Sequence, residues 1–454
     1  MALKNIFFIG IGGISQSALA IILKQNGYDV SGSDCVQSNI TKKLKKHGIC
    51  VYIGHNASNI NGADLVVYSS AIHNDNPELQ QAIAQKIPAV SRSSLLGAIA
   101  DAHGKVISIS GSHGKTTTTG MIAAIFLQAK KNPTIHIGGI LPQINGNVRV
   151  GSKKYFITEA CEYCDSFLSL KSFYSVVLNI QKDHMDYFKN MDNLQKSFEN
   201  FAKNTKQDGF LIINSDDPQS KMLESKALQI SFGIDNSAHV MAKNIRADKN
   251  QKYAFDLYVC GIKICKIKLS VNGKHNIYNA LAAICVALGE GISIKHIICA
   301  LKKYKASERR FEAINGTKAM VVHDYAHHPT EIAASIATAK KMCKGKLIVA
   351  FEPHTYSRTQ YLFDEFAHCF KGVDKLFLCP IYAARENPII GVTSNSLAAA
   401  IKQNGVDVQC ENSLQLCFKQ LMKYNKRKNF ILLLGAGTIV NLCESFKTKQ
   451  PNKK

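Results

Sequence analysis

A glycine-flanked lysine followed by a run of threonines is the feature of this sequence with the clearest chemical meaning. It lies in ISISGSHGKTTTTG, residues 107–120, between an apolar stretch and a predicted helix. Backbone N–H groups in such a turn and at the start of the helix bind phosphate oxygens, and the lysine adds a mobile positive charge. Only two residues separate the glycines, so the loop is shorter than the common phosphate-binding loop. The pattern predicts a phosphate site formed by Gly111, Ser112, His113, Gly114, Lys115, Thr116 and Thr117.

Acidic residues follow two later apolar stretches, in TEACEYCDSF (residues 158–167) and NIQKDHMDYF (residues 179–188). We expect both segments to follow strands of a parallel sheet, and the carboxyl ends of such strands are where these folds bind ligands. Glu159 and His184 are therefore predicted to join Thr116 in binding Mg²⁺ or Mn²⁺, because these ions accept oxygen and imidazole ligands. A salt-bridged rim of surface charges is the alternative.

Two further segments carry groups that suit a nucleotide. In GKHNIYNAL, His275, Asn276 and Asn279 lie at the start of a predicted helix, where they can hydrogen-bond a base or a phosphate; capping of the helix is the alternative. The segment ERRFE supplies Arg309 and Arg310, and a guanidinium group matches phosphate oxygens in geometry and charge. One of these arginines could reach a γ-phosphate, whereas a solvated basic pair is the simpler interpretation.

The last third of the chain carries HDYAHHPTE and EPHTYSR, each directly after an apolar stretch. Core packing does not explain so many polar side chains at two strand ends, so we expect them to form one polar cluster. Its members are Asp324, Tyr325, His327, His328, His354 and Arg358. Zinc binding is the alternative for the three histidines, but their spacing fits neither the HExxH motif nor a zinc finger.

The N-terminal segment KNIFFIGIGGISQSALAIILKQNGYDVSGSD predicts a strand, a glycine turn, a helix and a second strand. Gly10, Gly12 and Ser15 occupy the positions of a dinucleotide-binding fingerprint, and Asp34 lies at the sequence distance typical of a ribose contact. The third glycine of that fingerprint is missing. A pyrophosphate or a uridine nucleotide at the start of the helix therefore fits better than a nicotinamide cofactor.

Length and composition restrict the class of protein. The chain has 454 residues, 46% of them hydrophobic, which is enough for about three domains of ordinary size. Its net charge of +23 comes from lysines scattered along the chain, which argues against a nucleic-acid-binding arm and is compatible with phosphate-bearing substrates. The 14 cysteines lie mostly in apolar runs without disulfide spacing, and the glycine-broken apolar N-terminus is too short for membrane insertion. We therefore expect a cytoplasmic protein with reduced thiols.

Strand and helix patterns place these motifs in three α/β domains. Residues 1–100 are predicted to form a Rossmann-like domain, residues 101–312 a central domain with the parallel sheet of a phosphate-loop ATPase, and residues 313–454 a C-terminal Rossmann-like domain. Buried, β-branched runs alternate with helical patterns in all three. A more polar, alternating stretch from about residue 237 to residue 270 predicts antiparallel strands.

Taken in order, these motifs resemble those of the ATP-dependent Mur ligases. The matching segments are GIGG with VSGSD, GSHGKTTTT, EACEYCDSFL, NIQKDHMD, GKHNIYNALAA, ERRFE, DYAHHPTEI, PHTYSRT, IYAARE and LLLGAG. The resemblance implies an N-terminal domain for a UDP-sugar, a central ATPase and a C-terminal domain that admits an amino acid. It is strongest to the members that use UDP-N-acetylmuramate and L-alanine in peptidoglycan precursor synthesis. It implies that ATP phosphorylates the lactyl carboxylate, that the amine attacks the acyl phosphate, and that ADP and phosphate leave.

The resemblance also implies roles for particular residues, with ATP and Mg²⁺ (or Mn²⁺) as cofactors. Catalysis is implied for Lys115, His184 and Arg310, and metal binding for Thr116, Glu159 and His184. ATP binding is implied for Gly111, Ser112, His113, Gly114, Lys115, Thr116, Thr117, His275, Asn276, Asn279, Arg310 and Asp324. Binding of the two other substrates is implied for Gly10, Gly12, Gly13, Ser15, Asp34, Tyr325, His327, His354 and Arg358.

The chain departs from the family pattern at a few positions. Ser15 and Gln16 replace a glycine and a methionine, Cys161 and Tyr163 alter the acidic segment, and Thr438 replaces an acid after LLLGAG. Three other functions stay open: a recycling ligase that joins a tripeptide to the same sugar nucleotide, a nicotinamide dehydrogenase, and a nucleotide-binding protein without catalysis. DYAHHPTEI and IYAARE favour the alanine-adding members. A dehydrogenase would leave the phosphate loop unused, and a non-catalytic protein would make the metal and arginine positions incidental.

Overall fold

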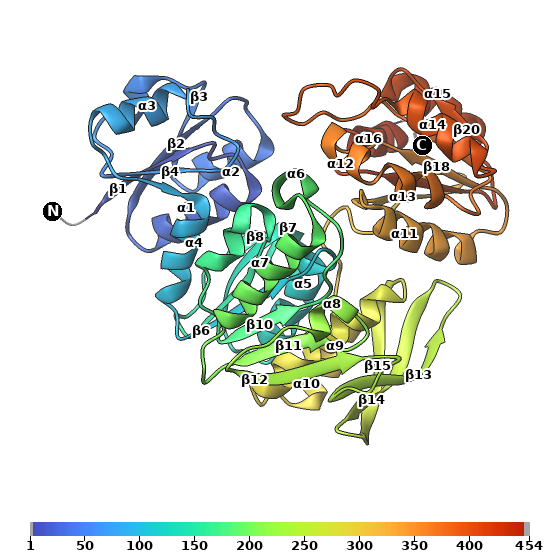
Figure 1. The fold of residues 1–454 in the computed structure, drawn as a ribbon, viewed down its shortest axis with the longest axis horizontal. Helices are drawn as coiled ribbons and strands as arrows, with labels where there is room; N and C mark the ends of the chain where they lie inside the picture. The colour runs from blue at the N-terminus through green and yellow to red at the C-terminus, as the bar shows by residue number, and fades with distance from the viewer. Residues whose placement is uncertain (1–2, 449–454) are drawn as a thin grey trace, which may run out of the picture.

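Three separate β-sheets organise residues 3–448, the part of the chain that this computed structural model describes. Figure 1 shows the N-terminal unit (blue) at upper left, the C-terminal unit (orange to red) at upper right and the central unit (green to yellow) below them. Each unit has helices packed against its own sheet. The three-domain α/β architecture predicted from the sequence is confirmed.

The N-terminal sheet is entirely parallel, in the order β3-β2-β1-β4-β5. Its central strand is apolar because helices cover both faces, and Phe8 and Ile9 are fully buried. The strands are β1 (Asn5–Ile9), β2 (Asp29–Asp34), β3 (Cys50–Ile53), β4 (Leu65–Tyr68) and β5 (Ala89–Ser91). The helices are α1 (Ile14–Gln25), α2 (Asn39–Lys46), the 3₁₀ helix η1 (Ala57–Ile60), α3 (Pro77–Ala84) and α4 (Arg92–Asp101).

The central sheet has ten strands in the order β15-β14-β13-β12-β11-β10-β6-β9-β7-β8. Its strands are β6 (Lys105–Ser110), β7 (Thr134–Leu141), β8 (Gly146–Arg149), β9 (Tyr155–Glu159), β10 (Tyr174–Val177), β11 (Phe210–Asn214), β12 (Leu228–Gly233), β13 (Val240–Ala247), β14 (Lys252–Val259) and β15 (Ile262–Asn272). Its helices are α5 (Lys115–Gln128), η2 (Pro142–Ile144), η3 (Tyr163–Ser169), α6 (Met185–Phe188), α7 (Met191–Lys203), α8 (Pro218–Lys221), α9 (His275–Gly289) and α10 (Ile294–Lys303). The antiparallel strands predicted near residues 237–270 are β13, β14 and β15.

The C-terminal sheet has the order β16-β17-β21-β18-β19-β20. Its strands are β16 (Glu312–Ile314), β17 (Met320–Asp324), β18 (Leu347–Phe351), β19 (Lys375–Leu378), β20 (Val408–Cys410) and β21 (Phe430–Leu434). Its helices are α11 (Pro329–Met342), α12 (Tyr356–Tyr361), α13 (Phe363–His368), α14 (Ser394–Gln403), α15 (Leu414–Lys423) and α16 (Val440–Thr448). Strand β16 runs antiparallel to β17 at one edge, and the other neighbouring strands are parallel.

The strand order of the central sheet brings three functional segments together. Strand β6 lies between β10 and β9, and all three run parallel. Their carboxyl ends therefore meet at one edge of the sheet. The phosphate loop follows β6, the first acidic segment follows β9 and the second follows β10, so the topology makes these segments neighbours.

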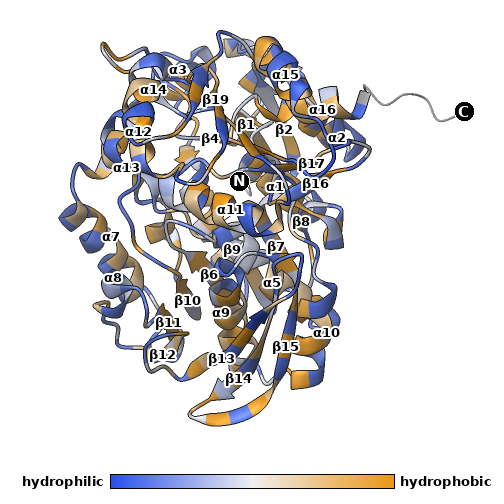
Figure 2. Cartoon of the chain, turned by 90° about the vertical axis from the view of Figure 1, so that its right-hand side faces the viewer, coloured by the Kyte–Doolittle hydropathy of each residue, from blue (hydrophilic) through white to orange (hydrophobic). Residues whose placement is uncertain are grey.

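Two buried helices fix the position of the nucleotide-binding groups. Helices α5 and α9 pack against each other, and α9 also packs on β11, β12 and β13. Both helices are apolar around most of their circumference and share one hydrophobic cluster. Figure 2 shows the hydrophobic residues gathered on the inner strands and on the inward faces of the helices. The N-termini of α5 and α9 are therefore held rigidly by the core behind them.

Within residues 3–448, every helix is too short or too polar to cross a lipid bilayer.

Helix α4 provides a test of the contact between the N-terminal and central units. A Cβ atom at Gly97 would lie 2.4 Å from the backbone oxygen of Ser169 in η3. Gly97→Ala is therefore expected to lower the free energy of unfolding by about 1–3 kcal/mol, although alanine is the better helix former. Urea unfolding measures the change. Ala98→Gly, at an exposed position of the same helix, is the control and measures only the difference in helix propensity between alanine and glycine. A Gly97→Ala protein that is more stable than the unaltered protein would contradict the close packing.

Candidate active site

The phosphate loop adopts a conformation that only glycine tolerates well. Gly111 and Gly114 have φ angles of +134° and +89°, and α5 begins immediately after Gly114. A Cβ atom at Gly114 would lie 2.5 Å from Oδ1 of Asn279 in α9. The loop is therefore pressed against α9, with the N-terminus of α5 open toward a ligand.

Lys115 forms a buried ion pair with a residue that the sequence analysis did not single out. Its Nζ lies 2.9 Å from Oε2 of Glu162, and it also donates to the carbonyl oxygen of Gly111 at 2.5 Å. The Glu162 side chain is only 1% exposed. Burial would lower the pKa of Lys115, but the Glu162 carboxylate raises that pKa above its ordinary value. Lys115 is therefore a fixed cation, folded back over the loop.

Thr116 and Glu159, predicted from the sequence as metal ligands, are in contact. The Thr116 hydroxyl donates to Oε2 of Glu159 at 3.0 Å, and the backbone N–H of Gly138 donates to Oε1 at 2.6 Å. Burial raises the pKa of Glu159. A hydroxyl and a carboxylate beside a phosphate loop form a donor set that fits a hard divalent cation.

His184, the third predicted metal ligand, lies in a second acidic group. One ligand atom each of Glu162, Asp183 and His184 lies within 4.8 Å of the others. Nε2 of His184 is 3.7 Å from Oε1 of Glu162 and 3.7 Å from Oδ2 of Asp183. The structure thus pairs Thr116 with Glu159 and places His184 with Glu162 and Asp183. Glu162 touches both Lys115 and His184 and so connects the loop to this group.

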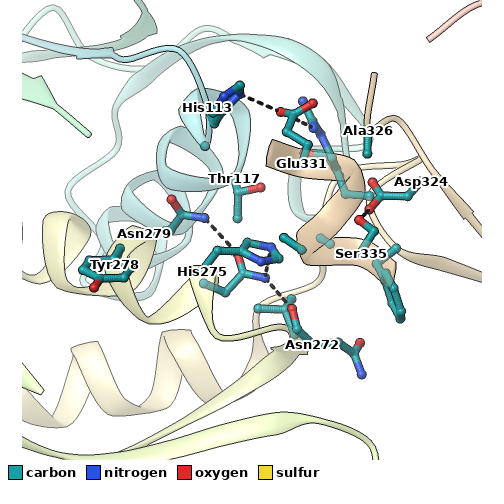
Figure 3. A pocket seen from close by; sticks show the side chains of 18 of the residues that line it. His113, Thr117, Asn272, His275, Tyr278, Asn279, Asp324, Ala326, Glu331 and Ser335 are labelled. Carbon is teal, nitrogen blue, oxygen red and sulfur yellow. Dashed lines mark hydrogen bonds and ion pairs between the residues drawn. The ribbon is translucent and has the colours of Figure 1, made fainter. Parts of the chain in front are cut away.

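A cavity of about 850 Å³ opens beside the phosphate loop, between the central and C-terminal units. Figure 3 shows His113 and Thr117 on one side, residues of α9 below them, and Asp324, Glu331 and Ser335 of the C-terminal unit opposite. Eight of the residues predicted to bind ATP line it. They are His113, Gly114, Thr117, His275, Asn276, Asn279, Arg310 and Asp324.

The polar groups of α9 form a chain of hydrogen bonds rather than a helix cap. The Asn279 amide donates to Oδ1 of Asn276 at 2.9 Å, and the Asn276 amide donates to the carbonyl of Asn272 at 2.6 Å. The capping residue is Lys274, whose side chain makes no capping hydrogen bond, so the capping alternative is excluded. Burial lowers the pKa of His275 to about 4, so its ring is neutral in the cavity.

The two arginines of ERRFE point to different places. Nη1 of Arg310 lies 3.9 Å from Oε1 of Glu331, and the Arg310 side chain faces the 850 Å³ cavity. Arg309 instead donates to the backbone oxygen of Gly437 at 3.1 Å. Asp324 accepts a hydrogen bond from Ser335 at 2.5 Å, and burial raises its pKa. Arg310 is thus the arginine available to a nucleotide.

A second cavity of about 440 Å³ lies where all three units meet. His73 comes from the N-terminal unit and Asp183 and His184 from the central unit. The C-terminal unit supplies the predicted Tyr325, His327, His354 and Arg358. This cavity adjoins the group of Glu162, Asp183 and His184, because Asp183 and His184 line it. Lys115 lines neither cavity, but its neighbour Gly114 lines the first one.

An ion pair between two units shapes the second cavity. The Arg358 guanidinium donates to Oδ1 of Asp183 from Nη2 at 3.0 Å. Burial would raise the pKa of Asp183, but Arg358 holds it well below its usual range. The rings of His327 and His354 lie 5.8 Å apart, and burial lowers their pKa values to about 3 and about 4. His328 turns away and contacts the carbonyl oxygen of Lys182. Across residues 3–448, these three histidines do not form a metal-ligating group.

The N-terminal glycine turn lies apart from both cavities. The backbone N–H of Gly12 donates to Oδ2 of Asp34 at 2.8 Å, and Gly13 precedes α1 without a side-chain cap. Gly10 has a φ of +78°. Neither cavity is lined by these residues. The open N-terminus of α1 retains the features of an anion site.

Ser15 connects this turn to the central unit. Its hydroxyl lies 2.8 Å from Nε2 of His136 in β7 and accepts a hydrogen bond from the half-buried Arg92 at 3.2 Å. Thr158 donates to a backbone oxygen and so accepts from Nδ1 of His136 at 2.8 Å. His136 is therefore the neutral tautomer with its proton on Nδ1, and Nε2 accepts from Ser15. Burial lowers the pKa of His136 to about 3.

Four charged side chains in these contacts were not singled out from the sequence. They are Arg92, Glu162, Asp183 and Glu331. Glu162, Asp183 and Glu331 lie within one to three positions of the predicted residues Glu159, His184 and His328. Their partners are distant in the sequence, so the one signal that could have identified them is their position close to the ends of predicted strands.

Fold and site together define a phosphate-loop nucleotide-binding protein with a Rossmann-like unit on each side of its central unit. Three family models cover most of the chain: the Mur ligase family catalytic domain matches residues 5–103, the Mur ligase middle domain residues 109–287, and the Mur ligase glutamate ligase domain residues 309–437. The chain belongs to the Mur ligase family.

Particular relatives match nearly the whole chain. It is 46% identical to the UDP-N-acetylmuramate--L-alanine ligase of Clostridium acetobutylicum, with 98% of each chain covered. It is 43% identical to the enzyme of the same name from Clostridium botulinum strain Loch Maree, over 98% of this chain and 97% of the other. The crystal structure of UDP-N-acetylmuramate-alanine ligase from Thermotoga maritima superposes with a TM-score of 0.84 at 26% identity and covers all of both chains. A murein peptide ligase from Psychrobacter arcticus shares the fold, with a TM-score of 0.74 at 22% identity over 99% of both chains.

His136 makes acid sensitivity testable. Its pKa is about 3 in the folded protein and about 6.5 in an unfolded chain, so the unfolded state binds the extra proton between these values. The stability from this residue is complete above pH 6.5 and is lost as the pH falls toward 3. The free energy of unfolding falls as the pH is lowered, and His136→Asn is expected to make this slope shallower by up to about 1.4 kcal/mol per pH unit. Urea titrations from pH 7 to pH 4 measure this. The exposed His47→Asn is the control, and equal slopes for both variants would contradict the assignment.

Proposed function

We propose that this chain joins L-alanine to the lactyl carboxylate of UDP-N-acetylmuramate, with conversion of ATP to ADP and phosphate. Identity over the whole chain to ligases of that name supports the reaction. The observation that carries it in the structure is the position of Lys115. Its neighbour Gly114 lines the nucleotide-sized cavity, and its partner Glu162 contacts His184, which lines the second polar cavity formed by all three units.

The first step requires a carboxylate oxygen to attack the γ-phosphorus of ATP while the bond to the β-phosphate oxygen breaks. In-line phosphoryl transfer depends on positioning and on neutralising charge, rather than on covalent chemistry from the protein. The loop N–H groups and Lys115 stabilise the phosphates, and Arg310 faces the cavity from the other side. Thr116 and Glu159 would hold a divalent cation, which supplies further neutralisation of phosphate charge when bound. His184 lies in the separate group with Glu162 and Asp183, which offers a second set of ligands.

The second step requires the amine of L-alanine to attack the acyl phosphate carbon, with phosphate as the leaving group. Arg358 is suited to the carboxylate of the amino acid because a guanidinium donates charge-assisted, paired hydrogen bonds. His327 and His354 are uncharged at neutral pH and so do not repel the amino group of the substrate. Tyr325 lines the same cavity.

The division of labour between the units follows from these sites. We assign the UDP-sugar to residues 1–100 with Gly10, Gly12, Gly13, Ser15 and Asp34, ATP to residues 101–312, and L-alanine to residues 313–454. The reaction would belong to cytoplasmic synthesis of peptidoglycan precursors. Neither nucleic acid nor membrane insertion has a part in this assignment.

Release of ADP in four parallel assays tests the function. The purified protein receives ATP and Mg²⁺ with UDP-N-acetylmuramate plus L-alanine, with the sugar nucleotide plus a murein tripeptide, with L-alanine alone, or with no acceptor. ADP formation that needs both the sugar nucleotide and L-alanine supports the proposal. Equal or faster release with the tripeptide would assign the recycling reaction instead, and release without any acceptor would indicate an ATPase.

Lys115→Met is expected to lower kcat by at least about a hundredfold, because the charge that balances the phosphates is lost. The single substitution also leaves Glu162 buried without a partner, which costs stability. The double variant Lys115→Met/Glu162→Gln removes that unpaired charge and is expected to be the more stable of the two. Turnover of either variant near that of the unaltered enzyme would end the assignment of Lys115.

Arg358→Ala is expected to raise the KM for L-alanine by about tenfold to a hundredfold, which corresponds to roughly 1.5–3 kcal/mol for a hydrogen bond to a charged group. The KM for ATP should change much less, because Arg358 lines the second cavity and not the nucleotide cavity. Initial rates with each substrate varied in turn separate the two constants. Collapse of ATP affinity with unaltered dependence on L-alanine would reassign Arg358 to the nucleotide.

A further inference from the structure

A carboxylate that the proposed mechanism does not use lies between the two cavities. Glu331 is in the first turn of α11, and its side chain is 17% exposed. It lines the nucleotide cavity from the C-terminal side (Figure 3). Its neighbours come from three separate segments: the phosphate loop, the ERRFE segment and the loop before α11.

The two oxygens of this carboxylate face different partners. Oε1 lies 3.3 Å from Nδ1 of His113 and 3.9 Å from Nη1 of Arg310. Oε2 lies 3.6 Å from Nδ1 of His327 and accepts the backbone N–H of His327 at 3.3 Å. One side chain thus connects a loop residue and an arginine of the nucleotide cavity to a histidine of the second cavity.

The surroundings keep Glu331 charged. Burial would raise the pKa of its carboxyl group, but the contact with His113 and the charge of Arg310 hold that pKa well below its ordinary value. A negative charge at the first turn of a helix also stabilises the helix, because it faces the positive end of the helix dipole. That local effect accounts for an acidic residue at the start of α11, but it does not account for its contacts with the central unit.

The contact of Glu331 with His113 exists only while the central and C-terminal units lie against each other. Its Nε2 lies 3.1 Å from Oε1 of Gln181, and its ring packs 4.4 Å from the ring of His328. The imidazole is therefore held from both units while Nδ1 points at Glu331, as Figure 3 shows. Separation of the units would break the Glu331–His113 contact and keep the contact with His327, which lies in the same unit as Glu331.

We propose that Glu331 is a positioning residue for the ligase reaction, which holds Arg310 over the phosphates and His327 beside the amino acid in one fixed geometry. This inference rests on the proposed function. Glu331 touches neither ATP nor L-alanine in this assignment and acts through its neighbours. Its removal is expected to slow turnover more than it weakens substrate binding.

Steady-state ADP release by the full-length enzyme with UDP-N-acetylmuramate, L-alanine and ATP tests the inference. E331Q keeps the size of the side chain and removes its charge. We expect kcat to fall about 30-fold, with the KM for ATP and for UDP-N-acetylmuramate each within about threefold of the unaltered enzyme. E331D, which shortens the reach of the carboxylate, is expected to lose at least about fivefold in kcat and serves if E331Q does not fold. A kcat within twofold for the folded variants overturns the inference.

A double-mutant cycle separates positioning from a merely structural role. If Glu331 acts through Arg310, E331Q is expected to cost less than about threefold in kcat when R310K is already present. Multiplicative losses would overturn the inference. E365Q is the matched control, because Glu365 pairs with Lys182 across the same two units and lines neither cavity; its kcat is expected to stay unchanged. If the unaltered enzyme forms no ADP from these substrates, the proposed function itself is overturned. If the unaltered enzyme is active and E331Q is equally active, only the role of Glu331 is overturned.

Discussion

The buried ion pair between Lys115 and Glu162 is the interaction on which the rest of the site depends. Lys115 begins α5 after β6, and Glu162 follows β9, so the pair exists only because these two strands are neighbours. His184, after β10 on the other side of β6, contacts the same carboxylate. Loss of one partner of such a pair leaves an unbalanced charge in the interior and costs about 3–5 kcal/mol. The strand order therefore brings the two charges together, and each charge needs the other in order to be tolerated in the interior.

The backbone around this pair is strained in the way that functional sites often are. Cys164, Asp165 and His184 all have φ angles between +52° and +55°, in the left-handed region. Each such residue costs free energy unless its surroundings hold it in place. The Asp165 carboxylate accepts hydrogen bonds from Tyr187 and Ser197, and the Asp183 carboxylate accepts the backbone N–H of His184. Asp183, which balances the charge of Arg358, thus also holds the loop that carries His184.

Sequence patterns predicted the positions of the strand ends and the pairing of Thr116 with Glu159, but not the charged partners of Lys115 and Arg358. The glycine spacing and the flanking apolar runs located the phosphate loop, and alternation located β13–β15, because both signals are local. Lys115 and Glu162 are 47 residues apart, and Arg358 and Asp183 are 175 residues apart, so their pairing depends on sheet order and on the packing of separate units. The capping alternative for α9 shows the same limit: it could be excluded only once the amide contacts with Asn272 and Asn279 were known.

The joints between the three units differ in chemistry, and this difference has a mechanical consequence. One hydrophobic cluster runs without interruption from Phe8 and Leu96 of the N-terminal unit to Phe156 and Phe198 of the central unit. The buried residues of the two clusters in the C-terminal unit all belong to that unit. Its contacts with the central unit include the ion pairs of Arg358 with Asp183 and Glu331 with His113, and the exposed pair of Lys182 with Glu365. Polar contacts can exchange with water at little net cost, whereas separating an apolar core exposes surface that water disfavours. The joint between the N-terminal and central units is therefore costlier to separate than the joint of the C-terminal unit. The charged groups at the joint of the C-terminal unit are also those of the two cavities, so the geometry of the site depends on how this unit packs against the central one.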